Sequence, residues 1–142
     1  MKQKFSLAAI LLFLTFSSEI FCQDNSWTGI HLTVAGHNTM DGVEASFKQG
    51  NCNGEEVVFI ELINHNDYDV SVTWSDAVFT QELKWVQKEN KEEKTFLLPA
   101  AATVKGDCSE GNVVLMIWLK DFIKDKKDFK RYGAANFTVA KK

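Results

Sequence analysis

The chain has 142 residues with 16 basic and 19 acidic side chains, which gives a formal net charge of −3 at pH 7. This charge excludes a general affinity for nucleic acid or for anionic lipid surfaces. The length is enough for one globular domain with a substantial core.

The N-terminus has the three-part pattern of a secretory signal peptide. Residues 1–4 contain two lysines, residues 5–16 are almost wholly apolar, and residues 17–19 are polar. The apolar run is short for a membrane span. We therefore expect residues 1–22 to be removed as a signal peptide, which leaves residues 23–142 as a single exported domain.

Cys22 offers an alternative fate for this segment. As a lipidated N-terminal cysteine it would tether the domain to a membrane, although Glu19 and Phe21 match a lipobox poorly. Removing the signal peptide takes away two lysines and one glutamate, and leaves 14 basic and 18 acidic residues with a net charge of −4. No second long apolar run follows, so we expect no transmembrane segment after signal removal.

The first part of the exported chain alternates between apolar and polar residues. In residues 27–35, Ile30, Leu32 and Val34 share one face, which predicts a strand. Residues 43–48 alternate in the same way after a turn-rich link, and predict a second strand.

The middle of the chain has the pattern of a β-hairpin. Residues 57–64 are apolar on both faces apart from Glu61, which is typical of a strand buried inside a sheet. After a short polar turn, residues 69–75 alternate strictly between apolar and polar side chains. The two segments are therefore predicted to pair with each other.

The rest of the chain predicts further short strands and charged loops. Pro99 interrupts one strand, which indicates an edge strand or two short pieces. The expected strands are residues 79–86 (with a helix as the alternative), 95–104, 113–119 and 134–140, and the expected charged loops are residues 87–94 and 121–131. About seven or eight short strands without a long helical pattern predict an all-β antiparallel sandwich.

Cys52 and Cys108 are each followed by four residues and then by Val-Val. Export to an oxidising compartment favours a disulfide between them, which contributes about 4 kcal/mol in the chain-entropy model. The strands after them are third and seventh in the predicted order, so we expect the bond to join two parallel-running core strands at one end. The alternative, a free catalytic cysteine, lacks a neighbouring base in the sequence.

Parts of the chain resemble small exported proteins of Bacteroidota bacteria. The likeness lies in Cys-Asn-Gly-Glu-Glu-Val-Val-Phe-Ile-Glu-Leu-Ile-Asn and Tyr-Asp-Val-Ser-Val-Thr-Trp within residues 52–74, in Leu-Pro-Ala-Ala-Ala at residues 98–102, and in Gly-Asp-Cys at residues 106–108. The junction at residues 21–23 is also similar to signal cleavage sites in such proteins. The resemblance implies an immunoglobulin-like β-sandwich and brings no catalytic residues with it.

Two tryptophans are candidate sugar-binding residues. Trp27 and Trp85 lie near predicted strand ends, and exposed aromatic rings stack on sugar faces. Trp74 and Trp118 lie in apolar strands and are expected in the core. Packing inside a β core is the alternative role for all four rings.

Cations in the loop 121–131 are candidates for contact with an anionic surface. These are Lys124, Lys126, Lys127, Lys130 and Arg131, of which Lys124, Lys127 and Arg131 are the selected candidates, although interleaved aspartates weaken the positive field. A solvated loop is the alternative. The polar residues 64–69 lack the spacing of a calcium loop and have the composition of a turn.

The sequence contains no hydrolase elbow, zinc-protease motif or phosphate loop. We therefore expect no catalytic residue, metal or cofactor. The predicted function is that of a non-catalytic module for protein interaction or envelope association, secreted or periplasmic, with an unknown envelope protein or glycan as partner and no role in binding nucleic acid. The alternative is a carbohydrate-binding module that uses Trp27 and Trp85.

Overall fold

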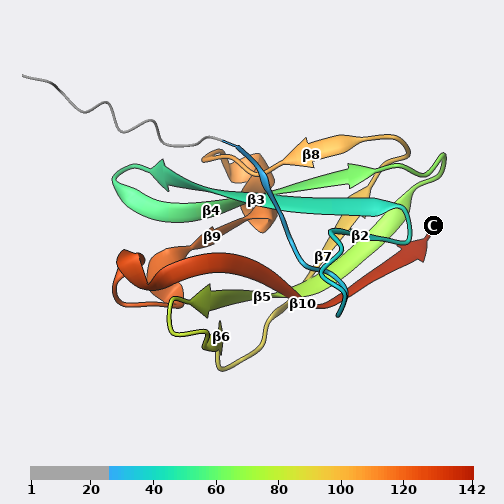
Figure 1. Ribbon diagram of the computed structural model, residues 1–142. Helices are drawn as coiled ribbons and strands as arrows, with labels where there is room; N and C mark the ends of the chain where they lie inside the picture. The colour runs from blue at the N-terminus through green and yellow to red at the C-terminus, as the bar shows by residue number, and fades with distance from the viewer. Residues whose placement is uncertain (1–25) are drawn as a thin grey trace, which may run out of the picture.

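The computed structural model of the protein describes residues 26–142. Two antiparallel β-sheets pack face to face around one large apolar core (Figure 1). The predicted all-β antiparallel sandwich is therefore confirmed. The signal peptide, its cleavage site and Cys22 lie outside the described residues. Within residues 26–142, no helix is long and apolar enough to cross a membrane.

The first sheet is built on a long hairpin. β3 (Val43–Cys52) and β4 (Glu55–Asn64) pair antiparallel along their whole length. Asn53 (φ 53°) and Gly54 (φ 87°) form the two-residue loop between them, and positive φ at both positions suits the twist of the strands. The remaining strands of this sheet are β1 (Thr28–Gly29) and β2 (Thr39–Met40) beside β3, and β8 (Thr103–Lys105) and β9 (Met116–Trp118) beside β4.

The second sheet is centred on β5 (Val70–Thr80). β10 (Phe129–Lys141) pairs with one edge of β5, and the short strands β6 (Trp85–Gln87) and β7 (Glu93–Leu98) pair with the other edge. Three 3₁₀-helices occur between β8 and β10, namely η1 (Glu110–Leu115), η2 (Leu119–Asp121) and η3 (Lys126–Asp128).

The predicted hairpin of residues 57–64 and 69–75 is wrong. β4 pairs with β3, β8 and β9 in the first sheet, whereas β5 belongs to the second sheet. The chain crosses between the sheets after Asn64, whose buried Nδ2 donates to the carbonyl oxygens of Tyr68 at 2.9 Å and Pro99 at 2.9 Å. The apolar faces of β4 and β5 therefore meet across the core instead of lying side by side.

The expectation of two parallel-running strands behind the cysteines is also wrong. Only Met116–Trp118 of the predicted strand 113–119 is extended, and it pairs antiparallel with β4. Val113 and Val114 belong to η1 instead. The first Val-Val pair therefore lies inside β4, and the second lies in η1, just before a strand that runs opposite to β4.

Two further predicted strands are shorter than expected. In residues 27–35 only Thr28–Gly29 is extended, because Gly36 (φ 80°) closes a turn in which its N–H donates to the Thr33 carbonyl at 2.9 Å. Residues 79–86 are neither one strand nor a helix. β5 ends at Thr80, and a turn leads into β6.

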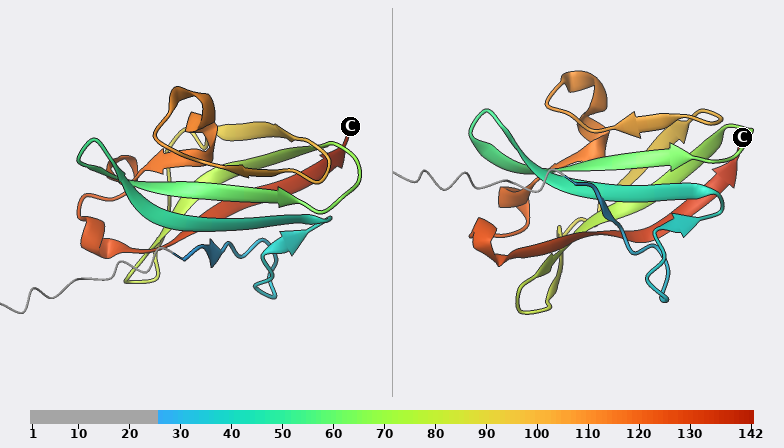
Figure 2. Two further views of the ribbon diagram at one scale, coloured as in Figure 1. Left: turned by 90° about the horizontal axis from the view of Figure 1, so that it is seen from above. Right: turned by 45° about the horizontal axis from the view of Figure 1, so that its top comes forward.

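The break at Pro99 is confirmed. β7 and β8 lie on either side of it and belong to different sheets. The last strand is longer than expected, because β10 begins at Phe129, inside the predicted loop 121–131. The segment before β3 runs along the side of the sandwich between β3 and β10 (Figure 2).

Candidate binding surface

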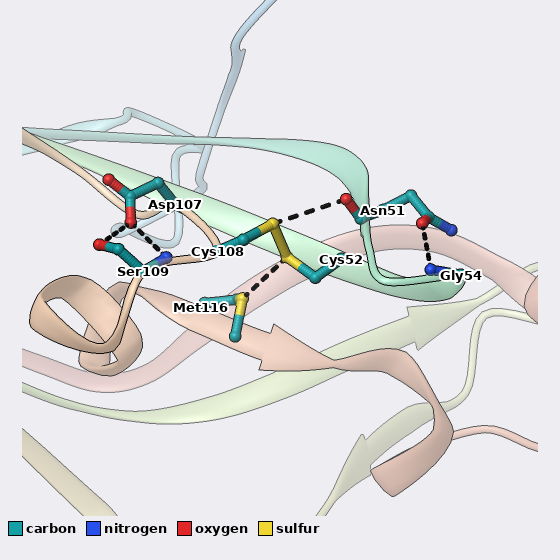
Figure 3. The surroundings of a disulfide bond; sticks show 7 residues. All are labelled: Asn51, Cys52, Gly54, Asp107, Cys108, Ser109 and Met116. Carbon is teal, nitrogen blue, oxygen red and sulfur yellow. Dashed lines mark hydrogen bonds between the residues drawn. A yellow bond between two sulfur atoms is a disulfide. The ribbon is translucent and has the colours of Figure 1, made fainter.

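The disulfide between Cys52 and Cys108 is present, with a Cα–Cα distance of 5.6 Å. It joins the end of β3 to the loop before η1, as Figure 3 shows. The Cys52 sulfur lies 3.7 Å from the sulfur of Met116. Because the Cys52 and Cys108 sulfurs are bonded to each other, neither cysteine is the free nucleophile of the alternative prediction.

A second, smaller apolar cluster surrounds this bond on the outer face of the first sheet. Cys52, Val57 and Met116 are buried in it, and the half-buried rings of Phe59 and Trp118 pack against them. The disulfide is thus part of a packed structural layer. Trp118, predicted to lie in the core, belongs to this outer cluster, whereas Trp74 lies in the main core at 1 % exposure.

Trp27 lies on the outer side of the first sheet under two lysines. The Lys48 and Lys105 ammonium groups stand 4.9 Å and 5.4 Å from the centre of its ring. Lys105 also pairs with Glu61 at 2.8 Å. These contacts cover part of the ring, and Trp27 is half-buried.

Trp85 is 44 % exposed and lies on the second sheet. Its six-membered ring occupies the space that a Cβ atom on Gly133 would fill, with ring carbons 2.4 Å and 2.5 Å from that position. It meets Phe79 edge-on at a centroid distance of 5.0 Å. The two predicted tryptophans are therefore carried by different sheets.

Arg131 lies beside this aromatic pair. Its guanidinium carbon is 4.5 Å from the centre of the Phe79 ring, which is an attractive cation–π geometry. Its Nη1 donates to Nδ1 of His31 at 2.6 Å, so that ring nitrogen is unprotonated in this contact. We call Phe79, Leu83, Trp85 and Arg131 the aromatic–arginine strip.

A β-bulge in β10 sets the direction of the side chains around Arg131. Phe129 is opposite Thr80 and Arg131 is opposite Phe79, so Lys130 is an extra residue in β10. The extra residue lets Phe129 and Tyr132 both point into the core, where each contacts Phe47. Bulges commonly redirect side chains in this way near functional sites.

A cavity of about 270 Å³ opens beside the bulge, between β1 and β3 of one sheet and β10 of the other. We call it the basic cradle. Its floor is made by the rings of Phe47 and Phe129, which meet edge to face at 6.1 Å. Its polar lining consists of Ser26, Thr28, Lys48, Gln49, Lys130 and Arg131. The lining contains three cations and no carboxylate.

Lys124 and Lys127 do not share the cradle with Arg131. Lys124 lines a separate groove of about 460 Å³ in which two neighbouring lysines are paired with acids, Lys120 with Glu55 at 3.1 Å and Lys126 with Glu56 at 2.9 Å. Lys127 is exposed at η3. The predicted cation cluster is therefore divided between two surfaces.

Sequence reasoning missed a mostly buried polar network between the sheets. Asp76 pairs with Lys94 at 2.7 Å, and Lys94 also donates to the carbonyl oxygens of Val114 at 2.9 Å and Met116 at 3.2 Å. The indole N–H of Trp74 donates to Asp76 at 3.0 Å. The signal in the sequence was Asp76 itself. The alternation that begins at Val70 places residue 76 on the inward face of β5, where a carboxylate needs a partner.

This network borders a cavity of about 170 Å³ on the open side of the sandwich. The groups inside it satisfy one another, because Lys94 uses its protons on one carboxylate and two carbonyls. Its geometry is that of a cross-sheet clamp. Within residues 26–142, no three His, Cys, Asp or Glu side chains are grouped so that they could hold a metal ion.

Comparisons with known proteins do not show a family for this chain. No family model and no curated protein sequence matches the chain. A solved structure of a DUF1425 family member from Shewanella sp. pv-4 is similar to 68 % of this chain and 75 % of its own, with 11 % sequence identity and a TM-score of 0.45. The resemblance to exported Bacteroidota proteins stays a prediction.

Proposed function

We propose that the protein is an exported, non-catalytic β-sandwich that recognises a partner in the cell envelope through the aromatic–arginine strip. The observation that carries the proposal is the exposed Trp85 ring beside Phe79 and Arg131. Tryptophan and arginine are enriched among the few residues that dominate protein–protein binding energy.

The strip has a fixed geometry before any partner arrives. Trp85 packs over Gly133 and against Phe79, while Phe79 also holds the Arg131 guanidinium. Pre-positioned side chains lose little conformational entropy on binding, so more of the contact energy is available for affinity. Leu83, at 62 % exposure, is a second exposed apolar side chain and lies two residues before Trp85, in the turn between β5 and β6.

The proposed location outside the cytoplasm is supported by the disulfide. Such bonds persist in oxidising compartments and are rare in the cytosol. The signal-like pattern of residues 1–22 points the same way.

A capture experiment with matched variants tests this function. The full-length chain, expressed with its own N-terminal segment and purified in oxidised form, is crosslinked to envelope fractions. We expect Trp85→Ala to lower capture of a specific partner by at least tenfold, the scale of a hot-spot residue. Leu97→Ala removes an exposed apolar side chain opposite Ser71, eight residues along β5 from Phe79, and serves as the control.

Gly133→Ala sharpens the test, because its methyl group needs the space of the Trp85 ring. Gly111→Ala is its control, since a Cβ atom there meets nothing within 4 Å. The proposal expects the first variant to lose capture and the second to keep it. Capture that survives both Trp85→Ala and Gly133→Ala would overturn the role of the strip.

Carbohydrate binding is the second candidate, and the exposed Trp85 ring favours it because aromatic rings stack on sugars. A site that uses Trp27 and Trp85 together would have to span both sheets. A glycan array distinguishes the two functions. Binding that depends on Trp85 but not on Arg131 favours a sugar, whereas an array without signal beside Trp85-dependent protein capture favours a protein partner.

A further inference from the structure

We propose that the basic cradle binds a phosphate group, carried by a small ligand or by a lipid headgroup. The inference deepens the proposed function, on which it rests, by naming the chemistry of a second contact next to the aromatic–arginine strip. It is drawn from the cavity lining, its charge and its shape.

The cradle concentrates positive charge on an acidic protein. Lys48, Lys130 and Arg131 line one cavity, while the whole chain has a net charge of −3. Among the described residues, none of these three cations forms an ion pair within 4.0 Å of a carboxylate, whereas Lys105, Lys120 and Lys126 all do. Lys48 stands over the Trp27 ring and Arg131 over the Phe79 ring, and neither contact neutralises the positive charge that an external anion would meet.

The donors outnumber what a carboxylate can use. Besides the three cations, the lining offers the hydroxyls of Ser26 and Thr28 and the amide of Gln49. A carboxylate presents two oxygens, but a phosphate presents three or four and accepts bidentate bonds from a guanidinium. The set of donors thus matches a phosphate better.

Arg131 is held in a position suited to this task. Phe79 contacts its guanidinium and His31 accepts from Nη1, which leaves other N–H groups of the fork for a ligand. The phenyl rings of Phe47 and Phe129 close the floor, so an ester substituent on the phosphate has an apolar surface to lie against.

The size of the cavity limits the ligand. About 270 Å³ accommodates one phosphate with a small substituent. In the separate groove, Lys120 and Lys126 are already paired with acids. We therefore infer that the cradle holds one phosphate group at a time.

Titration of the oxidised protein with inorganic phosphate, followed by ¹H–¹⁵N NMR, tests the site. We expect saturable shifts at Lys130 and the Arg131 side chain, and weaker binding of acetate. The double variant Lys48→Gln/Lys130→Gln should weaken phosphate binding roughly tenfold through the loss of two charged contacts. Lys124→Gln/Lys127→Gln has the same net charge and should bind as the parent does.

Three results would overturn the phosphate site. These are the absence of saturable shifts in the cradle, equal affinity for acetate, and an equal loss in the control pair. Both double variants should unfold at the parent's temperature, which excludes misfolding as the cause of any loss.

Vesicles separate the two sources of phosphate. Binding to vesicles of phosphatidic acid in phosphatidylcholine, lost in Lys48→Gln/Lys130→Gln, supports a lipid headgroup. Binding of inorganic phosphate without binding to these vesicles supports a small soluble ligand. Binding of neither overturns the inference.

The two proposals fail separately. A protein that captures its partner through Trp85 but does not bind phosphate retains the proposed function and loses the cradle. A protein that binds phosphate but captures nothing through Trp85 retains the phosphate site and loses the partner surface.

Discussion

Tyr132 is a fully buried phenol in contact with a carboxylate. It is 1 % exposed, its hydroxyl donates to Asp76, and it accepts from the indole N–H of Trp74 at 3.0 Å. Burial in the core, followed by the negative charge of Asp76 and the hydrogen bond to it, raises the pKa of Tyr132 well above its usual value. The residue is therefore held in its neutral form.

This raised pKa predicts a loss of stability in alkali. An unfolded tyrosine ionises near pH 10, whereas the folded phenol stays protonated, so the free energy of unfolding falls as the pH rises above about 10 toward the folded pKa. Urea denaturation at about pH 9 and pH 11 measures the effect. Tyr132→Phe should have a shallower pH dependence than the parent. Equal slopes in Tyr132→Phe and the parent would contradict this interpretation.

At the same scale, single residues explain why the site was predicted only in part. Trp85 and Arg131 each stand out in the sequence as an exposed aromatic and a loop cation. Their meeting depends on Phe79, which is paired with both of them across β6 and β10. That register joins residues about fifty positions apart in the chain, and local alternation carries no information about it.

Among the elements, the loop before η1 depends most directly on a covalent bond. Cys108 ties this loop to the end of β3, and η1 leads directly into β9. Reduction breaks this link, so the loop before η1 is no longer held to β3 in the folded protein. The unfolded chain also gains conformational entropy, because the bond no longer closes residues 52–108 into a ring.

We predict that Cys52→Ala/Cys108→Ala lowers the free energy of unfolding by about 4 kcal/mol, from the long loop that the bond closes. Chemical denaturation of the oxidised protein and the double variant measures this difference. Intact-mass analysis after alkylation should detect both thiols of this pair only when a reductant is added. Two alkylated thiols at these positions without reductant would contradict the brace.

The alternation of apolar and polar residues predicted where strands lie better than which strands pair with each other. Alternation in residues 43–48 and 69–75 correctly indicated strands, because the pattern reports which face of a strand is buried. It does not report which sheet a strand joins, so β4 and β5 were wrongly paired. The bulges at Lys130 and near Asn136 were equally invisible, since an extra residue is defined only against its partner strand.

On the scale of the whole molecule, the two sheets are joined by polar contacts as well as by the core. Lys94 of β7 reaches the carbonyl oxygens of Val114 and Met116 on the opposite sheet side while pairing with Asp76. The Lys94 and Asp76 side chains are 20 % and 11 % exposed, so water screens this pair only weakly.

Lys94→Met is expected to destabilise the protein by about 2–4 kcal/mol, because it leaves the Asp76 carboxylate mostly buried without its cation. Lys84→Met breaks a pair whose side chains are 72 % and 74 % exposed, and should leave the unfolding midpoint unchanged. Thermal and urea denaturation compare the two. The double variant Asp76→Asn/Lys94→Met should recover part of the loss, and equal effects of the two lysine variants would contradict the clamp.

The fold class followed from the sequence because three kinds of sequence signal indicated it: short alternating segments, turn residues and a cysteine pair. The topology did not follow, because a local pattern does not tell which sheet the next strand joins. Within residues 26–142 the chain crosses between the sheets after β4, between β7 and β8, and again between β9 and β10. The first of these links has the composition of a hairpin turn. Asn64 holds the first crossing, Pro99 lies in the second, and the third contains η2 and η3.

The position of Ser26 in the lining of the basic cradle gives the processing of the N-terminus a direct chemical consequence. Cleavage before residue 23 would create a new α-amino group only three residues away, within about 10 Å of extended chain. That amine has an ordinary pKa of about 7.7–8.0, so it would add a largely protonated cation to the rim at neutral pH. A lipid on Cys22 would instead hold the cradle within about 14 Å of the bilayer surface. Maturation would thus decide whether this pocket opens to free solution or to the headgroup layer.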